Sequence, residues 1–427
     1  MVAAATAVDN GATVIVLEKM VMLGGNTARS EGNMSAMDPE PEKLLPMTQA
    51  VRDIIAKYTN PKPSFRRRFS SSSQSGKKYI FDSPELFALQ TIVGGNCKND
   101  AKLVLTMTRN ATAAMKWLDV QSDMTWFHVP RSWVDVGIGG LYPRGQWPCQ
   151  ADGKTPISTY DAYIRPLAAK VEAAGNPIYK NMKVVSVERD ASGRVTGVKA
   201  LDRKGVERVF SGRSVVLAAG GYGANLQMVK KYNDISVTVT SNSPATTGEV
   251  LESTIAARPS DTPYVNCDGL RFVDETGRRD EISYGILKQT GQVAFSIYDQ
   301  RTIEEKKIES AIAHGYAFKA DTLEDLARQA GIDWKNFEKT MKAYNEASVS
   351  QNTKSLPVPK ILIGNPVVKA PFYAVPITTT IHHTMGGLRI NEKTQILDKN
   401  GNVIPGLYAA CETRAASTAA IASAATP

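Results

Sequence analysis

Glu18 ends a stretch whose residue types are those of a nucleotide-binding unit. Residues 3–10 are small and favour a helix, Gly11 follows them, and residues 13–17 are mostly β-branched. A helix closed by a glycine, then a strand, then an acid is the order of a dinucleotide-binding βαβ unit, in which the acid hydrogen-bonds the ribose hydroxyls. An ordinary buried αβ unit fits the same residues, because an acid after a strand is common.

The phosphate-binding part of such a unit is missing from the printed sequence. The acid normally lies about 20 residues after the first glycine of the phosphate-binding turn, whereas Glu18 has 17 residues ahead of it. The first strand and its glycine turn therefore belong before Met1. We interpret them as lost or omitted, because the rest of the unit is intact.

Further residues suited to chemistry stand in two later segments. Asp268 and three arginines lie within "NCDGLRFVDETGRRD", and two adjacent histidines occur in "IHHTMGGLRI". Arginine and histidine side chains can hold an anion or move a proton. Taken singly, arginines of this kind are more often surface or ion-pair residues, and a lone histidine is more often a core residue.

Composition limits the classes of function. The chain has 427 residues, of which 42% are hydrophobic and 22% charged, which is typical of a soluble globular protein with two domains. No apolar run approaches the ~18 residues of a membrane span, and no export signal is recognisable, so we expect a soluble protein in the cytoplasm, without a membrane partner. The four cysteines are scattered, which argues against a metal site, a disulfide framework and c-type haem.

The net charge of +9 raises the question of nucleic acid. Much of the excess lies in residues 62–78, "KPSFRRRFSSSSQSGKK", whose composition cannot bury a core. We interpret this segment as a surface loop rather than a nucleic-acid patch. A small anionic substrate explains a mild positive charge equally well.

The elements expected around these residues alternate between helix and strand. Helical periodicity covers residues 84–118 and 159–174, and the next 40 or so residues predict a three-stranded meander that leads into the apolar strand of "SVVLAAGGYGAN". From about residue 251 the pattern is α+β, with helices opened by Asp321 and Asp333. The chain then returns to strands, the last over residues 406–412.

Five segments in this order give a resemblance to a known family. They are "VIVLEKMVMLGGNTARSEGNMSA", "VVLAAGGYGAN", "NCDGLRFVDETGRRD", "IHHTMGGLRI" and "GLYAACE". Together they resemble the FAD-dependent fumarate reductase and succinate dehydrogenase flavoprotein family, and most closely its soluble branch, which includes fumarate and urocanate reductases. The resemblance implies an α/β fold with a Rossmann-like FAD-binding domain (1–250 and 384–427) interrupted by an α+β capping domain (251–383).

The resemblance also implies which residues hold FAD. Glu18 would accept from the adenosine ribose, the glycines of the "GGNT" loop would let the backbone approach the pyrophosphate, and an acid near the C-terminus would hold the ribityl chain. The implied cofactor residues are Glu18, Gly24, Gly25, Asn26, Thr27, Gly32, Val184, Ala219, Gly220, Gly221, His383 and Glu412. Glu31 stands where the family usually has a glycine, and we expect its carboxylate to crowd the flavin.

The activity implied is reduction of the carbon–carbon double bond of a small unsaturated carboxylate, with electrons from a donor that the sequence does not identify. Flavin N5 would deliver hydride to one carbon, and Arg279 would protonate the other. Asp268 and Arg271 stand where the family has a relay that restores this proton. His383 matches a histidine that touches both the substrate carboxylate and the flavin.

Two departures from the family support an alternative hypothesis. A further substrate-binding histidine is absent after "TTGEVLEST", and the residues after Glu412 lack the expected glycine-rich turn and substrate-clamping arginine. The alternative is a non-catalytic remnant that keeps the fold without binding flavin or substrate. Ketosteroid dehydrogenase and aspartate oxidase chemistry occur on the same fold, but Asp268, Arg271, Arg279 and His383 favour carboxylate reduction.

Overall fold

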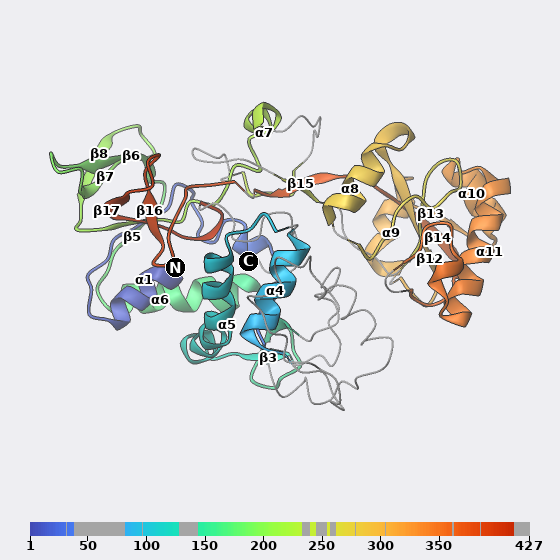
Figure 1. Cartoon of the computed structure of the whole chain (residues 1–427), viewed down its shortest axis with the longest axis horizontal. Helices are drawn as coiled ribbons and strands as arrows, with labels where there is room; N and C mark the ends of the chain where they lie inside the picture. The colour runs from blue at the N-terminus through green and yellow to red at the C-terminus, as the bar shows by residue number, and fades with distance from the viewer. Residues whose placement is uncertain are drawn as a thin grey trace. The chain divides into compact units, whose positions relative to one another are not determined.

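A computed structural model describes the chain except for residues 31, 38–81, 96, 128–143, 233–239, 245–253, 257–261, 278, 304, 361–362, 385 and 414–427. The predicted surface loop at 62–78 and Glu31 lie outside the described residues. The chain forms two compact units (Figure 1). Unit 1 comprises Met1–Thr254 and Ile381–Pro427, and unit 2 comprises Ile255–Thr380.

Unit 1 contains both helices and short strands. Its helices are α1 (Val2–Asp9), α4 (Pro84–Gly94), α5 (Ala101–Ser122), α6 (Arg165–Ala173) and α7 (Leu226–Tyr232), with a π-helix (Tyr160–Ile164) directly before α6. Its strands are β1 (Val16–Leu17), β2 (Met34–Ser35), β3 (Thr125–Phe127), β4 (Gly145–Cys149), β5 (Ile178–Tyr179), β6 (Lys183–Arg189), β7 (Val195–Leu201), β8 (Glu207–Ser211), β9 (Val215–Leu217), β16 (Gln395–Leu397) and β17 (Val403–Ala409).

The first helix, turn and strand occur in the predicted order. Gly11 has φ +75°, the left-handed conformation that ends a helix at a glycine. Strand β1 is shorter than the predicted strand 13–17, because the N–H of Val14 donates to the side-chain Oδ1 of Asn176 at 2.7 Å instead of to another strand. Strand β1 then pairs in parallel with β5.

Hydrophobic clusters hold unit 1 together; one packs Ala88 and Ile92 of α4 against Val104 of α5, and two others are larger. The larger one packs α1, α5, α6 and β3, and its buried side chains include Ala5, Met115, Leu118, Trp126, Leu167 and Val171. The smaller one lies among β7, β16 and β17 and includes Val195, Ile396 and Leu407. The predicted meander is confirmed, because β6, β7 and β8 form an antiparallel sheet in sequence order. Strand β9 pairs in parallel with β17, which brings residues about 190 positions apart into register.

The last strand of the chain differs from the prediction of residues 406–412. Strand β17 covers Val403–Ala409, and Glu412 lies in a 3-10 turn, Cys411–Thr413. The turn begins at Cys411, whose φ of +57° cannot continue a strand.

Unit 2 is an antiparallel sheet with helices. The sheet has the order β11-β12-β14-β13, with helices α10 and α11 beside it (Figure 1). Hydrophobic side chains of these two helices pack against the sheet around the buried Phe337 and Tyr344. Its elements are β11 (Tyr264–Val265), α8 (Arg279–Leu287), β12 (Ala294–Asp299), α9 (Glu305–Ala313), β13 (Phe318–Ala320), α10 (Leu323–Ala330), α11 (Trp334–Ser350) and β14 (Phe372–Ile377). The chain passes between the units in β10 (Thr254–Ala256) and β15 (Thr380–His383), which pair with each other.

One of the two predicted helix caps is correct. Asp333 caps α11, since its carboxylate accepts from the N–H of Asn336 at 2.9 Å. Asp321 does not cap α10. The cap is the next residue, Thr322, whose hydroxyl accepts from the N–H of Asp325 at 3.0 Å.

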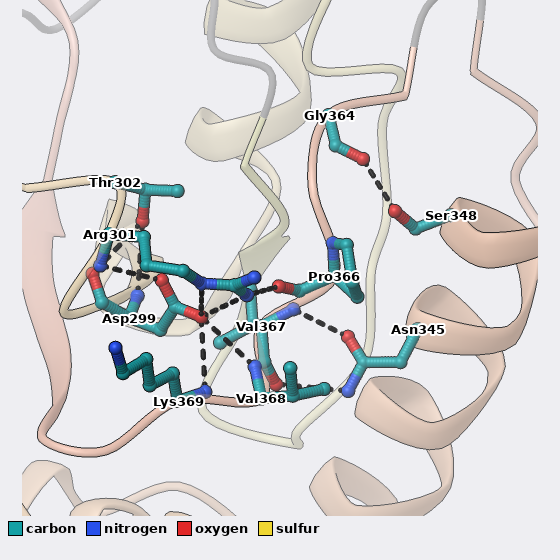
Figure 2. A network of polar contacts seen from close by, with 10 residues as sticks. All are labelled: Asp299, Arg301, Thr302, Asn345, Ser348, Gly364, Pro366, Val367, Val368 and Lys369. Carbon is teal, nitrogen blue, oxygen red and sulfur yellow. Dashed lines mark hydrogen bonds and ion pairs between the residues drawn. The ribbon is translucent and has the colours of Figure 1, made fainter.

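A polar network ties β12 and α11 to residues 364–369 (Figure 2). Asp299, at the end of β12, has a fully buried side chain. Its carboxylate accepts from the guanidinium of Arg301 and from the backbone N–H groups of Val368 and Lys369, the latter two at 3.1 Å. Asn345 of α11 bonds both backbone groups of Val367, its amide donating to the carbonyl and its Oδ1 accepting from the N–H. These contacts fix a segment that has no regular structure of its own.

Two features are absent from the described residues. None of the helices described is long and apolar enough to cross a membrane. In the described ranges there is also no group of three or more histidine, cysteine or acidic side chains that could hold a metal ion.

Candidate functional site

Glu18 and the strand that carries Val184 lie together at one end of the candidate nucleotide site. The N–H of Glu18 donates to the carbonyl of Tyr179, and its own carbonyl accepts from the N–H of Met182, both at 2.8 Å. Its carboxylate oxygen Oε1 accepts from the N–H of Met20 at 2.8 Å. Val184 follows Met182 by two residues in β6, where it pairs with Ala200. Glu18 and Val184, two of the predicted cofactor residues, are therefore neighbours in the folded chain.

The "GGNT" loop turns sharply on two glycines. Gly24 has φ +113° and Gly25 φ +50°, which other residues rarely adopt. A Cβ on Gly24 would lie 2.7 Å from the Cβ of Ala28, so the loop folds closely over itself there. A Cβ on Gly25 would meet no atom of the described residues within 4 Å. Thr27 begins a 3-10 turn directly after Asn26. The backbone at Gly25 is thus open to close approach, as binding of a pyrophosphate requires.

Four segments that are far apart in the sequence meet at the carboxyl group of Glu412. Its Oε1 accepts from the N–H of Thr384 at 2.8 Å, and its Oε2 accepts from the side-chain amide of Asn26 at 3.3 Å. The N–H of Gly221 also donates to this carboxyl group. Burial raises the pKa of Glu412 above its usual value, although these three donors act in the opposite direction.

The end of strand β9 is held against the same acid. The hydroxyl of Thr413 donates to the carbonyl of Gly220 at 3.3 Å, and the N–H of Ala410 donates to the carbonyl of Leu217 at 2.9 Å. Ala219 lies between these two contacts. A Cβ on Gly221 would lie 1.8 Å from Oγ1 of Thr384, so only glycine fits at this position.

Gly32 is fixed from three sides. Its φ of +76° is in the left-handed region, and a Cβ there would lie 2.5 Å from Cγ2 of Thr159. Its carbonyl accepts from the hydroxyl of Tyr163 at 2.6 Å. Burial raises the pKa of Tyr163 well above its usual value, so the hydroxyl keeps its proton and remains a donor.

The predicted catalytic residues lie in different units. Asp268 and Arg271 are in unit 2, as is Arg279, the first residue of α8, whereas His383 is the last residue of β15 and belongs to unit 1. The side chains of Arg279 and His383 lie outside the described part of the structure. Their catalytic roles therefore stay predictions.

Asp268 lies at an exposed turn that is anchored to helix α11. The flanking Gly269 has φ +75°, and a Cβ on it would lie 2.5 Å from the carbonyl oxygen of Asp333. The carbonyl of Gly269 accepts from the hydroxyl of Thr340 at 2.7 Å. Asp268 itself accepts from the side-chain amide of Asn266 at 3.3 Å and stays exposed.

Arg271 is paired with Glu275 rather than with Asp268. Its Nε and Nη2 each donate to one carboxylate oxygen of Glu275 at 2.7 Å. Nη2 also donates to the carbonyl of Val273 at 3.3 Å, and Nη1 donates to the carbonyl of Val358 at 2.8 Å. Glu275 is fully buried and also contacts Nζ of Lys360 at 3.2 Å. Burial alone would raise the pKa of Glu275, but Lys360 and Arg271 outweigh it and hold that pKa below its usual value.

Sequence reasoning missed several residues of these arrangements. Asn242 accepts from the amide of Asn26 at 2.7 Å and in turn donates to the carbonyl of Ile381 at 2.9 Å, which ties the "GGNT" loop to β15. No local pattern marks Asn242. Glu275 could have been noticed, because an acid four residues after an arginine can pair with it.

Comparison with known proteins adds to this geometry. The model of the FAD binding domain family matches residues 69–262 and 262–425. The NADH:acrylate oxidoreductase of Vibrio harveyi is 30% identical over 95% of this chain, which spans 45% of that protein. The urocanate reductase of Eggerthella lenta is 28% identical over 96% of the chain and 67% of that protein. The open conformation of a flavocytochrome c3 fumarate reductase superposes with TM-score 0.67 at 25% identity, covering 97% of this chain and 71% of the other.

The described residues of unit 1 fit FAD. Oγ1 of Thr384 is buried, lies beside Gly221 and has no hydrogen-bond partner among the described residues, which leave its hydrogen-bonding capacity unused. The open backbone at Gly25 and the half-buried carboxyl group of Glu412 suit a pyrophosphate and a hydroxyl-bearing ribityl chain respectively. The fold likewise mixes helix and sheet, as the FAD-binding relatives do.

Proposed function

Because the chain belongs to the FAD-binding domain family and FAD is its cofactor, we propose that it reduces the carbon–carbon double bond of a small unsaturated carboxylate. The observation that carries the proposal is the meeting of Asn26, Gly221 and Thr384 at Glu412, which builds an FAD site from four of the five resembling segments. Acrylate, urocanate and fumarate, the substrates named for the similar proteins, all have a double bond conjugated with a carboxylate.

In this proposal, unit 1 is a Rossmann-like FAD-binding domain and unit 2 is the capping domain inserted into it. Unit 1 is made of two stretches of sequence, and all the predicted cofactor residues fall within them. Unit 2 carries Asp268, Arg271 and Arg279. The residues proposed to bind FAD thus lie in unit 1, and those proposed to supply the proton lie in unit 2.

The protein's own residues handle the substrate and the proton. Bound FAD, once reduced by an electron donor, would supply hydride to one carbon of the double bond. Arg279 donates a proton to the other carbon, and His383 holds the substrate carboxylate, whose negative charge grows during the reaction. A guanidinium is a very weak acid, but a carbon that is gaining negative charge is basic enough to take its proton.

Asp268 and Arg271 act together as the relay that restores the proton of Arg279. Asp268 is exposed and can therefore take protons from water. The turn that carries it is fixed on α11. Arg271 acts from an anchored position, since Glu275 holds two of its nitrogens. Both residues precede α8, which begins at Arg279.

The test compares two neighbouring arginines in the full chain loaded with FAD. The flavin is reduced anaerobically, and its reoxidation by fumarate, urocanate or acrylate is followed by absorbance. We expect Arg279→Lys to lose most of the turnover while keeping its flavin, because lysine keeps the charge but not the planar guanidinium. Arg278→Lys is the matched control and should behave as the parent.

The outcomes separate the two hypotheses. If the parent binds FAD and Arg279→Lys reoxidises at the parent rate, or if Arg278→Lys is the inactive variant, the assignment of Arg279 is wrong. A parent chain that shows no flavin absorbance after incubation with FAD supports the alternative of a non-catalytic remnant.

A further inference from the structure

Lys360 is a buried cation that the mechanism above does not use. Its side chain is fully buried, as is that of Glu275, and its Nζ lies 3.2 Å from Oε2 of Glu275. Nζ also lies over the ring of Tyr344, 5.5 Å from the ring centre. A buried ion pair often stabilises a protein no more than an apolar pair of the same size, so its role is better sought in what it holds in place.

The group that Lys360 holds in place is the carboxylate of Glu275, which in turn holds Arg271. Oε2 of Glu275 contacts Lys360 and Nη2 of Arg271, and Oε1 accepts from Nε of Arg271 and from the N–H of Tyr264 at 2.8 Å. Burial would raise the pKa of Glu275, and the charge of Lys360 is the largest of the effects that lower it. Lys360 thus helps to keep ionised the carboxylate that binds two nitrogens of Arg271.

The segment that carries Lys360 also contacts Arg271 directly. Nη1 of Arg271 donates to the carbonyl of Val358 at 2.8 Å. Val358 lies between two prolines, which fix their own φ and keep the residue before them extended, so this segment is stiff. The contacts of Arg271 with described residues use the N–H of Nε, both N–H groups of Nη2 and one of Nη1. Among these residues, the second N–H of Nη1 is the one without an acceptor.

Helix α11 supports both residues of the proposed relay. The hydroxyl of Thr340 donates to the carbonyl of Gly269, beside Asp268. Tyr344, whose ring lies against Lys360, is four residues further along α11, and residues at this spacing share one face of a helix. One face of one helix therefore supports the turn of Asp268 and the lysine behind the other relay residue.

We propose that Lys360 is a positioning residue of the proton relay, which keeps the carboxylate of Glu275 charged and in place against Arg271. The inference rests on the proposed function, because it takes Arg271 to be part of the relay. Lys360 itself does not meet the substrate. Without its charge, Glu275 takes up a proton more readily, and a neutral carboxyl group holds a guanidinium less tightly than a carboxylate does.

The test compares lysine variants of the full chain loaded with FAD. Lys360→Met removes the charge and keeps an unbranched side chain, whereas Lys360→Arg keeps the charge. The control is Lys319→Met on β13, because Lys319 also lies over a tyrosine ring, that of Tyr373 at 5.9 Å, but is exposed. Anaerobic reoxidation of the reduced flavin is measured against the concentration of fumarate, urocanate or acrylate and against pH.

At neutral pH we expect Lys360→Met to lower the maximum rate by roughly tenfold to a hundredfold, because a small displacement of a group in the reaction path has an effect of this size. The flavin content and the substrate concentration at half the maximum rate should stay as in the parent, since Lys360 is proposed to contact neither FAD nor substrate. Lys360→Arg should recover part of the rate, and Lys319→Met should behave as the parent.

The dependence on acid separates positioning from packing. The charges that act on Glu275 are those of Lys360 and Arg271, and those that act on Lys360 are Glu275, Arg271 and Asp274. In Lys360→Met the pKa of Glu275 rises, so the rate should begin to fall at a higher pH than in the parent as acid is added. In Lys360→Arg the fall should begin where it does in the parent. Every other acid is the same in all variants, so its titration cancels in the comparison.

Hydrogen exchange of the peptide that contains Tyr264 reports on Glu275 without flavin, because the N–H of Tyr264 donates to that carboxylate. Its protection, corrected for the intrinsic exchange rate, should be lost at a higher pH in Lys360→Met than in the parent. If methionine prevents folding, Lys360→Gln gives the same measurements, since it lacks the charge but can still donate a hydrogen bond.

The outcomes keep this inference apart from the proposed function. An equal rate and an equal dependence on acid in Lys360→Met and the parent would overturn the inference and leave the proposed function intact. An unchanged pH dependence of the exchange at Tyr264 would overturn it as well. A parent whose reduced flavin is reoxidised by none of the three acids would overturn the proposed function, and the relay with it.

Discussion

We expect Glu412 to make the binding of FAD depend on pH. Its carboxyl group has a pKa raised by burial, and the ribityl hydroxyls it is proposed to hold donate best to the ionised form. FAD binding therefore lowers this pKa and releases a proton. We expect the affinity for FAD to fall as the pH drops through this pKa, which lies above the usual 4.5 of a glutamate, by at most about tenfold per pH unit because one proton is linked.

Calorimetric titrations of FAD at a series of pH values check this expectation, with Glu412→Gln as the control. Glutamine cannot ionise, so its affinity should be weaker at neutral pH and flat across the range. A parent profile that is as flat as that of Glu412→Gln would show that the carboxyl group does not contact the cofactor.

Gly221 sets how closely strand β9 approaches Thr384. We expect Gly221→Ala to destabilise the protein by about 1–3 kcal/mol and to weaken FAD binding, because the new methyl group would overlap Oγ1 of Thr384. Adding Thr384→Ala should restore part of the stability, since the overlapping oxygen is removed. Urea denaturation of the single and double variants measures this coupling.

The control for this series is Gly212→Ala, where the nearest atom to the new Cβ is the carbonyl oxygen of Ser214 at 3.5 Å. It should leave both stability and FAD affinity close to those of the parent. If Gly221→Ala is equally harmless, the close approach of β9 to Thr384 is not a requirement of the site.

At the scale of elements, the network around Asp299 fixes the end of β12 to the segment before β14 (Figure 2). Burial alone would raise the pKa of Asp299, but hydrogen bonds from Arg301, Val368 and Lys369 outweigh it and hold the pKa below its usual value of 3.8. A carboxylate with a lowered pKa stabilises the fold above that value, and the contribution is lost as the pH falls through the folded pKa.

We therefore expect unit 2 to lose stability below about pH 4, and Asp299→Asn to remove this dependence. At neutral pH the substitution should cost roughly 2–4 kcal/mol, because the asparagine amide would face N–H donors. Hydrogen exchange of α11 amides reports on unit 2 directly. Asp325→Asn, which removes an exposed ion pair with Arg328, is the control and should change exchange little.

At the scale of the whole molecule, all the predicted cofactor residues belong to unit 1 and the predicted proton-handling residues to unit 2. We expect FAD to slow hydrogen exchange most strongly in unit 1, at the "GGNT" loop, the end of β9 and the turn at Glu412. A ligand at 100 times its dissociation constant stabilises the fold that binds it by about 2.7 kcal/mol.

Mass spectrometry of the full chain with and without FAD measures this pattern peptide by peptide. ADP in place of FAD should protect the region of Glu18 and β6 and leave the turn at Glu412 as it is without ligand. Protection that is strongest in β12 and β14 of unit 2 would contradict the placement of the cofactor in unit 1.

The sequence by itself determined the local elements and the family. The glycine after α1, the meander of β6 to β8 and the cap at Asp333 depend on contacts within a few residues, so propensity and pattern predict them. The five resembling segments predicted a family that the comparisons then confirmed. The order of these five segments along the chain was enough to predict the family, because each segment has a distinctive set of residue types.

Only the tertiary structure decided which of these residues meet. Asn26, Thr384 and Glu412 are separated by hundreds of residues or belong to different segments, and it is the parallel pairing of β9 with β17 that brings the last segment to the glycines after β9. The partner of Arg271 proved to be the buried Glu275, because a buried charge is retained where the most complete set of hydrogen bonds is available. Burial and pairing depend on the whole chain, and a local pattern cannot contain them.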